Sequence, residues 1–338
     1  MKTHQTKYLS YGILILLLGL FPLAAGDYDV VLMSRVMCFA ILALSLDLIW
    51  GYTGFLSFGQ GAFFGIGSYG IGLTLKYLQF PGVTYLGILL GTISAMFFGI
   101  LLGYFLFYGR VSGIYFGIIT LALTTILYSI VNHPDAFHIT GGQNGLYGPF
   151  LMPTYGIPGI WEYKRTVISS YANYYTIMAG FIFAFAVGRF LVNSPFGKIL
   201  KAIQENEERL EFLGYNVANI KIAVFGISCG MAGFAGCISV PVHFIGPTVF
   251  GLLFSTSVII WVALGGRGTL IGPVVGALIV TYVENWLSTQ FEYLWVLLMG
   301  MFFVFFVLFQ PNGLFGILRQ LGTAIQKRHS TIKQQRLE

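Results

Sequence analysis

Charge is scarce in this 338-residue chain: 9% of its residues are Asp, Glu, Lys or Arg, against roughly 25% in an average soluble protein. Hydrophobic residues make up 57% and aromatic residues 17%, and the mean hydropathy is +0.81. This balance excludes an ordinary soluble domain. The apolar runs do not alternate in polarity as the strands of a transmembrane barrel do. We therefore expect an all-α polytopic membrane protein.

Motifs for catalysis and for metal or nucleotide binding are also missing. The three cysteines (Cys38, Cys229 and Cys237) lie in apolar runs without paired spacing, and the five histidines show no ligand spacing. No Ser/His/Asp or Cys/His cluster is present, and no G-x-x-x-x-G-K-[ST] loop occurs. The sequence thus predicts a protein that is not an enzyme and that carries no metal or cofactor of its own.

Apolar runs near the ~20 residues needed to cross ~30 Å of hydrocarbon recur along the chain. They predict about ten membrane spans: 8–25, 29–50, 61–79, 83–108, 111–131, 172–192, 221–244, 249–264, 269–286 and 293–316. With both termini in the cytoplasm, fourteen of the eighteen Lys and Arg residues fall on the cytoplasmic side, as the positive-inside rule requires. Basic residues scattered over loop ends do not form a nucleic-acid surface. The first span, with "LAAG" at its end, reads as a retained helix, with a cleaved signal peptide as the alternative.

The cytoplasmic segment 193–220 is unusually polar for this chain. Ser194 and Pro195 predict a helix start, capped by the serine hydroxyl, for a short helix to about Gln204. Its apolar face would hold Phe196, Ile199, Leu200 and Ile203. Asn206 is expected to cap a second helix, Glu207 to Leu213, which Gly214 ends. Two capped amphipathic helices favour docking into a partner's groove; a solvated connecting loop is the alternative.

Two further segments are candidates for the solute path. Residues 51–60, "GYTGFLSFGQ", are too polar and glycine-rich for a lipid-facing helix, and interrupted helices often mark transport sites. Their polar members Tyr52, Thr53, Ser57 and Gln60 suit a neutral, amide-like solute, unless the segment is a surface loop. In the outer segment 132–171, "TGGQNGLYG" predicts either an outer gate or docking edge, or a plain glycine-rich turn. Its candidate residues are Thr140, Gly141, Gly142 and Asn144.

Two ionisable residues, Arg35 and Asp47, lie within one predicted span. Twelve helical residues separate them by roughly 18 Å, so they cannot pair with each other. Such groups are costly in a membrane and are usually paired or functional. We expect each to partner another span.

Several longer stretches resemble one family. "ENEERLEFLG" resembles the coupling loop of ATP-binding-cassette importer permeases, with Glu208 and Gly214 at the family spacing, although a downstream Leu-Pro is missing. The stretches at 51–70, 140–146, 194–216 and 310–318 are similar to permeases of the LivM/LivH type for branched-chain amino acids. The stretches at 211–216, 259–280 and 284–314 look most like the urea-type permeases within this family.

The resemblance implies an importer permease with residues 1–28 as N-terminal tail and first span, 29–318 as permease domain with its coupling loop at 193–220, and 319–338 as a polar cytoplasmic tail. It implies that Glu205, Asn206, Glu207, Glu208 and Gly214 contact an ATPase. The expected partners are a second permease subunit, two cytoplasmic ATP-binding subunits that hydrolyse the ATP, and an external solute-binding protein, in a bacterial inner membrane. The expected solute is urea; a branched-chain amino acid or short amide is the alternative. A secondary transporter or channel is the alternative from another class.

Overall fold

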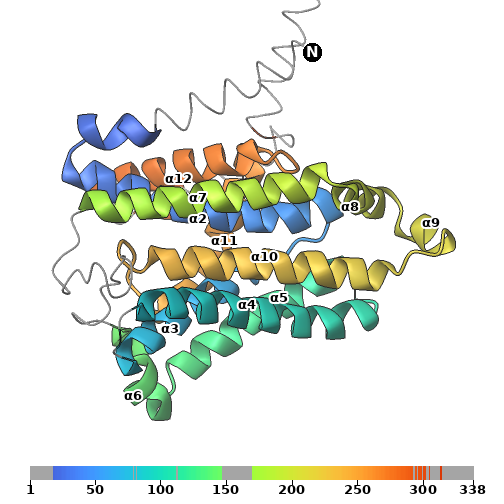
Figure 1. Cartoon of the computed structure of the whole chain (residues 1–338), viewed down its shortest axis with the longest axis horizontal. Helices are drawn as coiled ribbons and strands as arrows, with labels where there is room; N and C mark the ends of the chain where they lie inside the picture. Colours follow the sequence, from blue (N-terminus) through green and yellow to red (C-terminus); the bar gives the residue numbers. More distant parts are fainter. Residues whose placement is uncertain are drawn as a thin grey trace, which may run out of the picture.

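The computed structural model describes residues 18–78, 80, 82–111, 113–146 and 170–291, together with 294, 296–298, 300, 301, 304 and 313. Residues 1–17, most of the predicted span 293–316 and the whole tail 319–338 lie outside the described residues. The described part is built of helices (Figure 1). In chain order the α-helices are α2 (Asp27–Thr53), α3 (Gln60–Tyr77), α4 (Val83–Tyr108), α5 (Ile114–Val131), α6 (Phe137–Thr140), α7 (Ser170–Asn193), α8 (Pro195–Glu205), α9 (Glu207–Phe212), α10 (Val217–Ser239), α11 (Leu252–Gly265) and α12 (Ile271–Gln290).

Six of the described helices are long and apolar enough to cross a membrane: α2, α4, α5, α7, α10 and α12. The expectation of a polytopic helical membrane protein is therefore confirmed, and α4 has the predicted bounds 83–108. Two other predicted spans differ from the structure. The span 221–244 is shifted, because α10 already ends at Ser239, close before Pro241. The span 249–264 is divided into a 3₁₀ turn, Pro247–Phe250, and the 14-residue α11, which is about 21 Å long.

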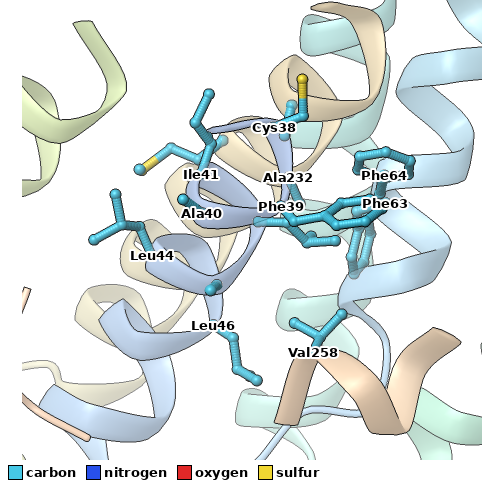
Figure 2. Packing of buried hydrophobic residues seen from close by; sticks show 14 of the residues in the cluster. Cys38, Phe39, Ala40, Ile41, Leu44, Leu46, Phe63, Phe64, Ala232 and Val258 are labelled. Atoms are coloured by element: carbon cyan, nitrogen blue, oxygen red, sulfur yellow. The ribbon is translucent and has the colours of Figure 1, made fainter. Parts of the chain in front are cut away.

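Helix α2 forms the centre of the molecule. In its most apolar 18-residue stretch 83% of the residues are buried, against 28% in α4, α5 and α7. It packs against α7, α10, α11 and α12. Figure 2 shows Phe39 of α2 beside Phe63 and Phe64 of α3, with Ala232 of α10 and Val258 of α11 nearby. Contacts on all sides explain why α2 is uniformly apolar rather than amphipathic.

Glycines let α3, α4 and α10 approach each other closely. A Cβ added at Gly67 would overlap the backbone of Gly233, and one added at Gly236 would overlap the carbonyl of Phe64. Small residues at helix contacts are typical of membrane proteins, where close packing replaces the hydrophobic driving force. The run 226–236, "GISCGMAGFAG", thus forms part of this packing face. Cys229 and Cys237 are free, buried core residues of the same helix.

Candidate functional site

The polar segment between α7 and α10 folds into the two short helices that the sequence predicts. The Asn206 side chain caps α9 by accepting a 2.9 Å hydrogen bond from the Arg209 backbone. Gly214 ends the segment with φ +87°, a value that glycine adopts without strain. The predicted Ser194 cap is wrong: its hydroxyl donates to the Leu191 carbonyl at 2.7 Å, and Pro195 begins α8 without a side-chain cap. The Gly197 N–H, which such a cap would bind, donates instead to the Ser194 backbone carbonyl at 3.1 Å.

The apolar face of α8 turns inward. Leu200 and Ile203 are buried, with Phe196 and Ile199 packed around them. The same cluster includes Tyr52 at the end of α2 and Val217 at the start of α10. The predicted amphipathic face therefore anchors α8 to its own transmembrane helices. It is not free to enter a partner's groove.

Helix α9 instead leaves large side chains uncovered. Phe212 is 90% exposed and Leu213 is 69% exposed, whereas Leu210 is buried. Among the predicted coupling residues, Glu205, Asn206 and Glu208 are exposed. A groove of about 850 Å³ runs beside α9, between it and the α4–α5 turn, and Glu207, Glu208 and Glu211 line it. Isolated exposed hydrophobics need no explanation, but two adjacent ones on a charged tip favour a contact surface.

Lys221 of α10 connects α9 to the transmembrane core. Its ammonium forms an ion pair with Glu207 and lies 4.3 Å from the Phe55 ring centre and 5.7 Å from that of Phe107. Lys221 itself is only 5% exposed. One side chain thus joins α9, the segment after α2 and α4. The sequence alone placed Lys221 only among the cytoplasmic positive charges, because Phe55 and Phe107 lie far away in the chain.

The segment that joins α2 to α3 is irregular and enclosed by protein. Gln60, at the start of α3, accepts a hydrogen bond from Ser45, eight residues before the end of α2. The connection therefore returns about 12 Å into the bundle before α3 begins. Its backbone groups find internal partners: Phe58 N–H donates to Thr120 and Gly59 N–H to Ser57. This is how irregular backbone is tolerated at depth in a membrane protein.

The four polar residues proposed for the solute path lie in or beside this connection. Tyr52 and Thr53 are 3% exposed, and Ser57 and Gln60 are 1% exposed. Gln60 also donates to Ser228 of α10 at 3.2 Å, which ties α2, α3 and α10 into one polar network. In this conformation Ser57 and Gln60 hold the helix break together, whereas Thr53 donates to Ile49 of its own helix. Their contact with a moving solute stays a prediction.

The outer glycine-rich stretch is a built turn. Thr140 donates to the carbonyls of Val131 and Ala136, and Gly141 and Gly142 have positive φ. Leu146 then pairs with Ile245 in an isolated antiparallel bridge. The two glycines allow the tight turn of the chain, and Asn144 is exposed at its tip.

Asp47 has a hydrogen-bond partner outside its own helix, as its position in a membrane span predicts. Its carboxylate accepts a 2.6 Å hydrogen bond from Gly268 N–H, in the turn between α11 and α12. The ring of Trp50, one turn further along α2, lies 5.8 Å from the Arg267 guanidinium of the same turn. The turn 265–269, "GGRGT", is thereby fixed to the C-terminal part of α2. Among the described residues no group of three or more His, Cys, Asp and Glu side chains is placed to hold a metal ion.

Comparison with known proteins agrees with this architecture. The model of the family described as branched-chain amino acid transport system, permease component, matches residues 30–307. The permease protein LivM of the high-affinity branched-chain amino acid transport system of Salmonella typhimurium is 29% identical, over 88% of this chain and 72% of its own. LivM of Escherichia coli is 28% identical, over 94% and 77%.

A shorter likeness, 29% over 31% of this chain, links it to the ribose import permease protein RbsC of Haemophilus influenzae. No solved structure matches the chain. The family match covers most of the molecule, including α2 to α12. This chain belongs to the family of permease components of branched-chain amino acid transport systems, which are transport subunits and not enzymes.

Proposed function

We propose that this chain is the permease subunit of an ATP-driven importer and that its solute is a branched-chain amino acid. The observation that carries the proposal is the extent of the likeness, which reaches 88% and 94% of the chain for two permeases of branched-chain amino acid systems. The urea specificity expected from three stretches of sequence finds no support in these relatives. The alternative solute, a branched-chain amino acid, agrees better with these relatives.

In this proposal α9 is the contact with a cytoplasmic ATPase subunit. Exposed Phe212 and Leu213 supply the apolar contact. Asn206 and Gly214 mark the two ends of α9. The negative charge beside the contact comes from Glu205, Glu207 and Glu208. The packing of α8 against its own transmembrane helices supports this role of α9, because movement of α9 is then transmitted to those helices. The ion pair of Lys221 with Glu207 and its contact with Phe55 give movement of α9 a direct route to the helix break after α2.

The same proposal places the chain in a bacterial inner membrane with α9 and both termini in the cytoplasm. A second permease subunit, two ATP-binding subunits and an external solute-binding protein complete the importer. The turn at Thr140, Gly141, Gly142 and Asn144 lies at the opposite end of the bundle from α9 (Figure 1). That position supports its proposed role as a docking edge for the binding protein.

The test is uptake of labelled leucine by cells that carry this chain with its neighbouring subunits, with excess urea or valine as competitor. We expect uptake that valine reduces and urea does not. A matched strain whose ATPase subunit lacks its Walker lysine should show no accumulation. Accumulation of urea without leucine would overturn the proposed solute, and accumulation in the control strain would overturn ATP-driven import.

A further inference from the structure

A second polar site lies away from α9, in the half of the bundle near the start of α2. A cavity of about 270 Å³ is lined by residues of α2, α11, α12 and the α10–α11 connection. A neighbouring cavity of about 350 Å³ shares His243, Phe254, Ser257 and Glu284 with it and continues between apolar side chains. Together they reach the size of typical small-molecule sites. In the proposed orientation this half of the bundle faces outward.

Two opposite charges line the cavity from different helices. Arg35 comes from α2 and Glu284 from α12. Among the described residues neither forms a direct ion pair, although the Arg35 charge is close enough to stabilise the Glu284 carboxylate. Arg35 makes one long hydrogen bond, 3.4 Å, to the Val242 carbonyl, and its buried Nε has no partner in the described part of the chain. The Thr281 hydroxyl in the same wall is likewise buried without one. Ionisable groups left unpaired within a membrane bundle are costly, which favours a functional role.

Aromatic rings form the rest of the wall. The rings of Phe39 and Trp261 stack with their centres 4.8 Å apart, and Phe254 stacks on His243 at 6.3 Å. Burial, helped by the Arg35 charge, lowers the pKa of His243, in the α10–α11 connection, to about 4. The imidazole is therefore neutral at neutral pH. The cavity presents one positive charge, one negative charge and an apolar aromatic surface.

We infer that this cavity is a solute site for a zwitterionic α-amino acid with an apolar side chain. Arg35 binds the carboxylate, Glu284 binds the ammonium group, and Phe39, Phe254 and Trp261 contact the side chain. A guanidinium suits a carboxylate because its parallel N–H groups match the two oxygens. This inference rests on the proposed function and extends it by giving the amino acid a binding site inside the permease.

The charges favour a zwitterion over urea. Urea is neutral and would bring no counter-charge to either residue, whereas a zwitterion brings one to each. A purely structural role for the two residues would bring them into a direct ion pair, and the described structure has none between them. Both charged side chains line the same cavity, whose volume of about 270 Å³ leaves room for a ligand that bears both charges.

The test is binding of labelled leucine to the purified permease–ATPase complex in nanodiscs, without binding protein. Unlabelled leucine should displace the label, whereas leucinol, which lacks the carboxylate, and 4-methylpentanoate, which lacks the amine, should do so weakly. Arg35→Gln should weaken leucine binding about tenfold or more and abolish the preference for leucine over leucinol. Glu284→Gln should abolish the preference for leucine over 4-methylpentanoate.

Three controls separate binding from folding. Arg35→Lys keeps the charge and should keep the preference for leucine over leucinol. Asp29→Asn removes an exposed carboxylate of α2 outside the cavity and should change nothing. Every variant is checked for complex assembly by size exclusion, and a variant that fails to assemble is replaced by Phe39→Leu, which should selectively weaken binding of leucine relative to alanine.

The outcomes distinguish this inference from the proposed function. A complex that imports leucine but binds none without the binding protein, or whose variants keep the wild-type preferences, refutes the cavity site and leaves the importer assignment intact. A complex that imports no leucine at all overturns the proposed solute first and this inference with it.

Discussion

Replacing Phe212 with Ala tests whether α9 is a contact surface. The ring is 90% exposed, so its removal deprives the folded chain of almost no internal packing. Stability of the isolated permease should therefore change by less than about 0.5 kcal/mol, as for other surface substitutions. If the ring is buried in a groove of the ATPase, its loss is felt only in the complex.

The expected effect on the complex follows from the exposed area. A phenylalanine buries about 150–250 Å², and at about 25 cal/mol per Å² burial of nine-tenths of it is worth about 3–6 kcal/mol as an upper limit. Central interface anchors cost about 2 kcal/mol or more when truncated. We therefore expect the ATPase to bind at least about 30-fold more weakly to Phe212→Ala, since 1.4 kcal/mol is a factor of ten.

Titration of labelled ATPase subunit against the permease in nanodiscs measures this affinity, and thermal unfolding of the permease alone measures stability. Phe190→Ala is the matched control, because this ring of α7 is 76% exposed but lies on a membrane-spanning helix. It should leave the affinity unchanged. Equal affinities for wild type and Phe212→Ala, with unchanged stability, would refute the assignment of α9 as the ATPase contact.

Three further changes test the local physics. Gly214→Ala should reduce leucine uptake without affecting membrane insertion. The added Cβ meets no neighbour, but at φ +87° it costs about 1–2 kcal/mol in backbone strain. Gly214→Asn tolerates this conformation better and should lose less of the uptake; equal loss of uptake in the two variants would refute the strain argument. Asp47→Ala should lower the unfolding free energy by about 1–3 kcal/mol, because Gly268 N–H loses its acceptor. In the same thermal unfolding experiment the unfolding free energy of Asp47→Asn should stay within about 1 kcal/mol of wild type. A larger loss of stability in Asp47→Asn than in Asp47→Ala would contradict this. Gly236→Ala should destabilise by about 1–3 kcal/mol, because the new methyl overlaps the Phe64 carbonyl of α3, and an unchanged melting temperature would show that α3 and α10 separate freely.

Local features of the chain were predictable because their causes are local. The apolar run 83–108 alone determined α4, since any segment of that length and hydropathy must satisfy its backbone as a helix in lipid. Asn206 and Gly214 marked the ends of α9 because capping and positive φ depend on adjacent residues. Where two local options were both satisfactory, as for the Ser194 hydroxyl, the sequence-based choice failed.

The direction in which a helix face turns was not predictable from its pattern. The apolar stripe of α8 has the spacing expected for a docking helix, yet it packs on Tyr52 and Val217 of its own chain. A stripe specifies that a face is buried and leaves open against what. The exposed contact surface falls instead on Phe212 and Leu213, whose spacing carries no helical signal.

Composition and hydropathy by themselves determined that this protein is a helical membrane protein, because the cost of burying polar backbone and charge in lipid acts on every residue regardless of its neighbours. Only the tertiary structure brought Arg35 and Glu284 to one cavity, and Lys221 to Glu207 and Phe55. These residues lie in different elements of the fold, and their meeting depends on how glycine-lined helices cross. Pairwise packing of that kind is a property of the assembled bundle, so the candidate sites became visible only there.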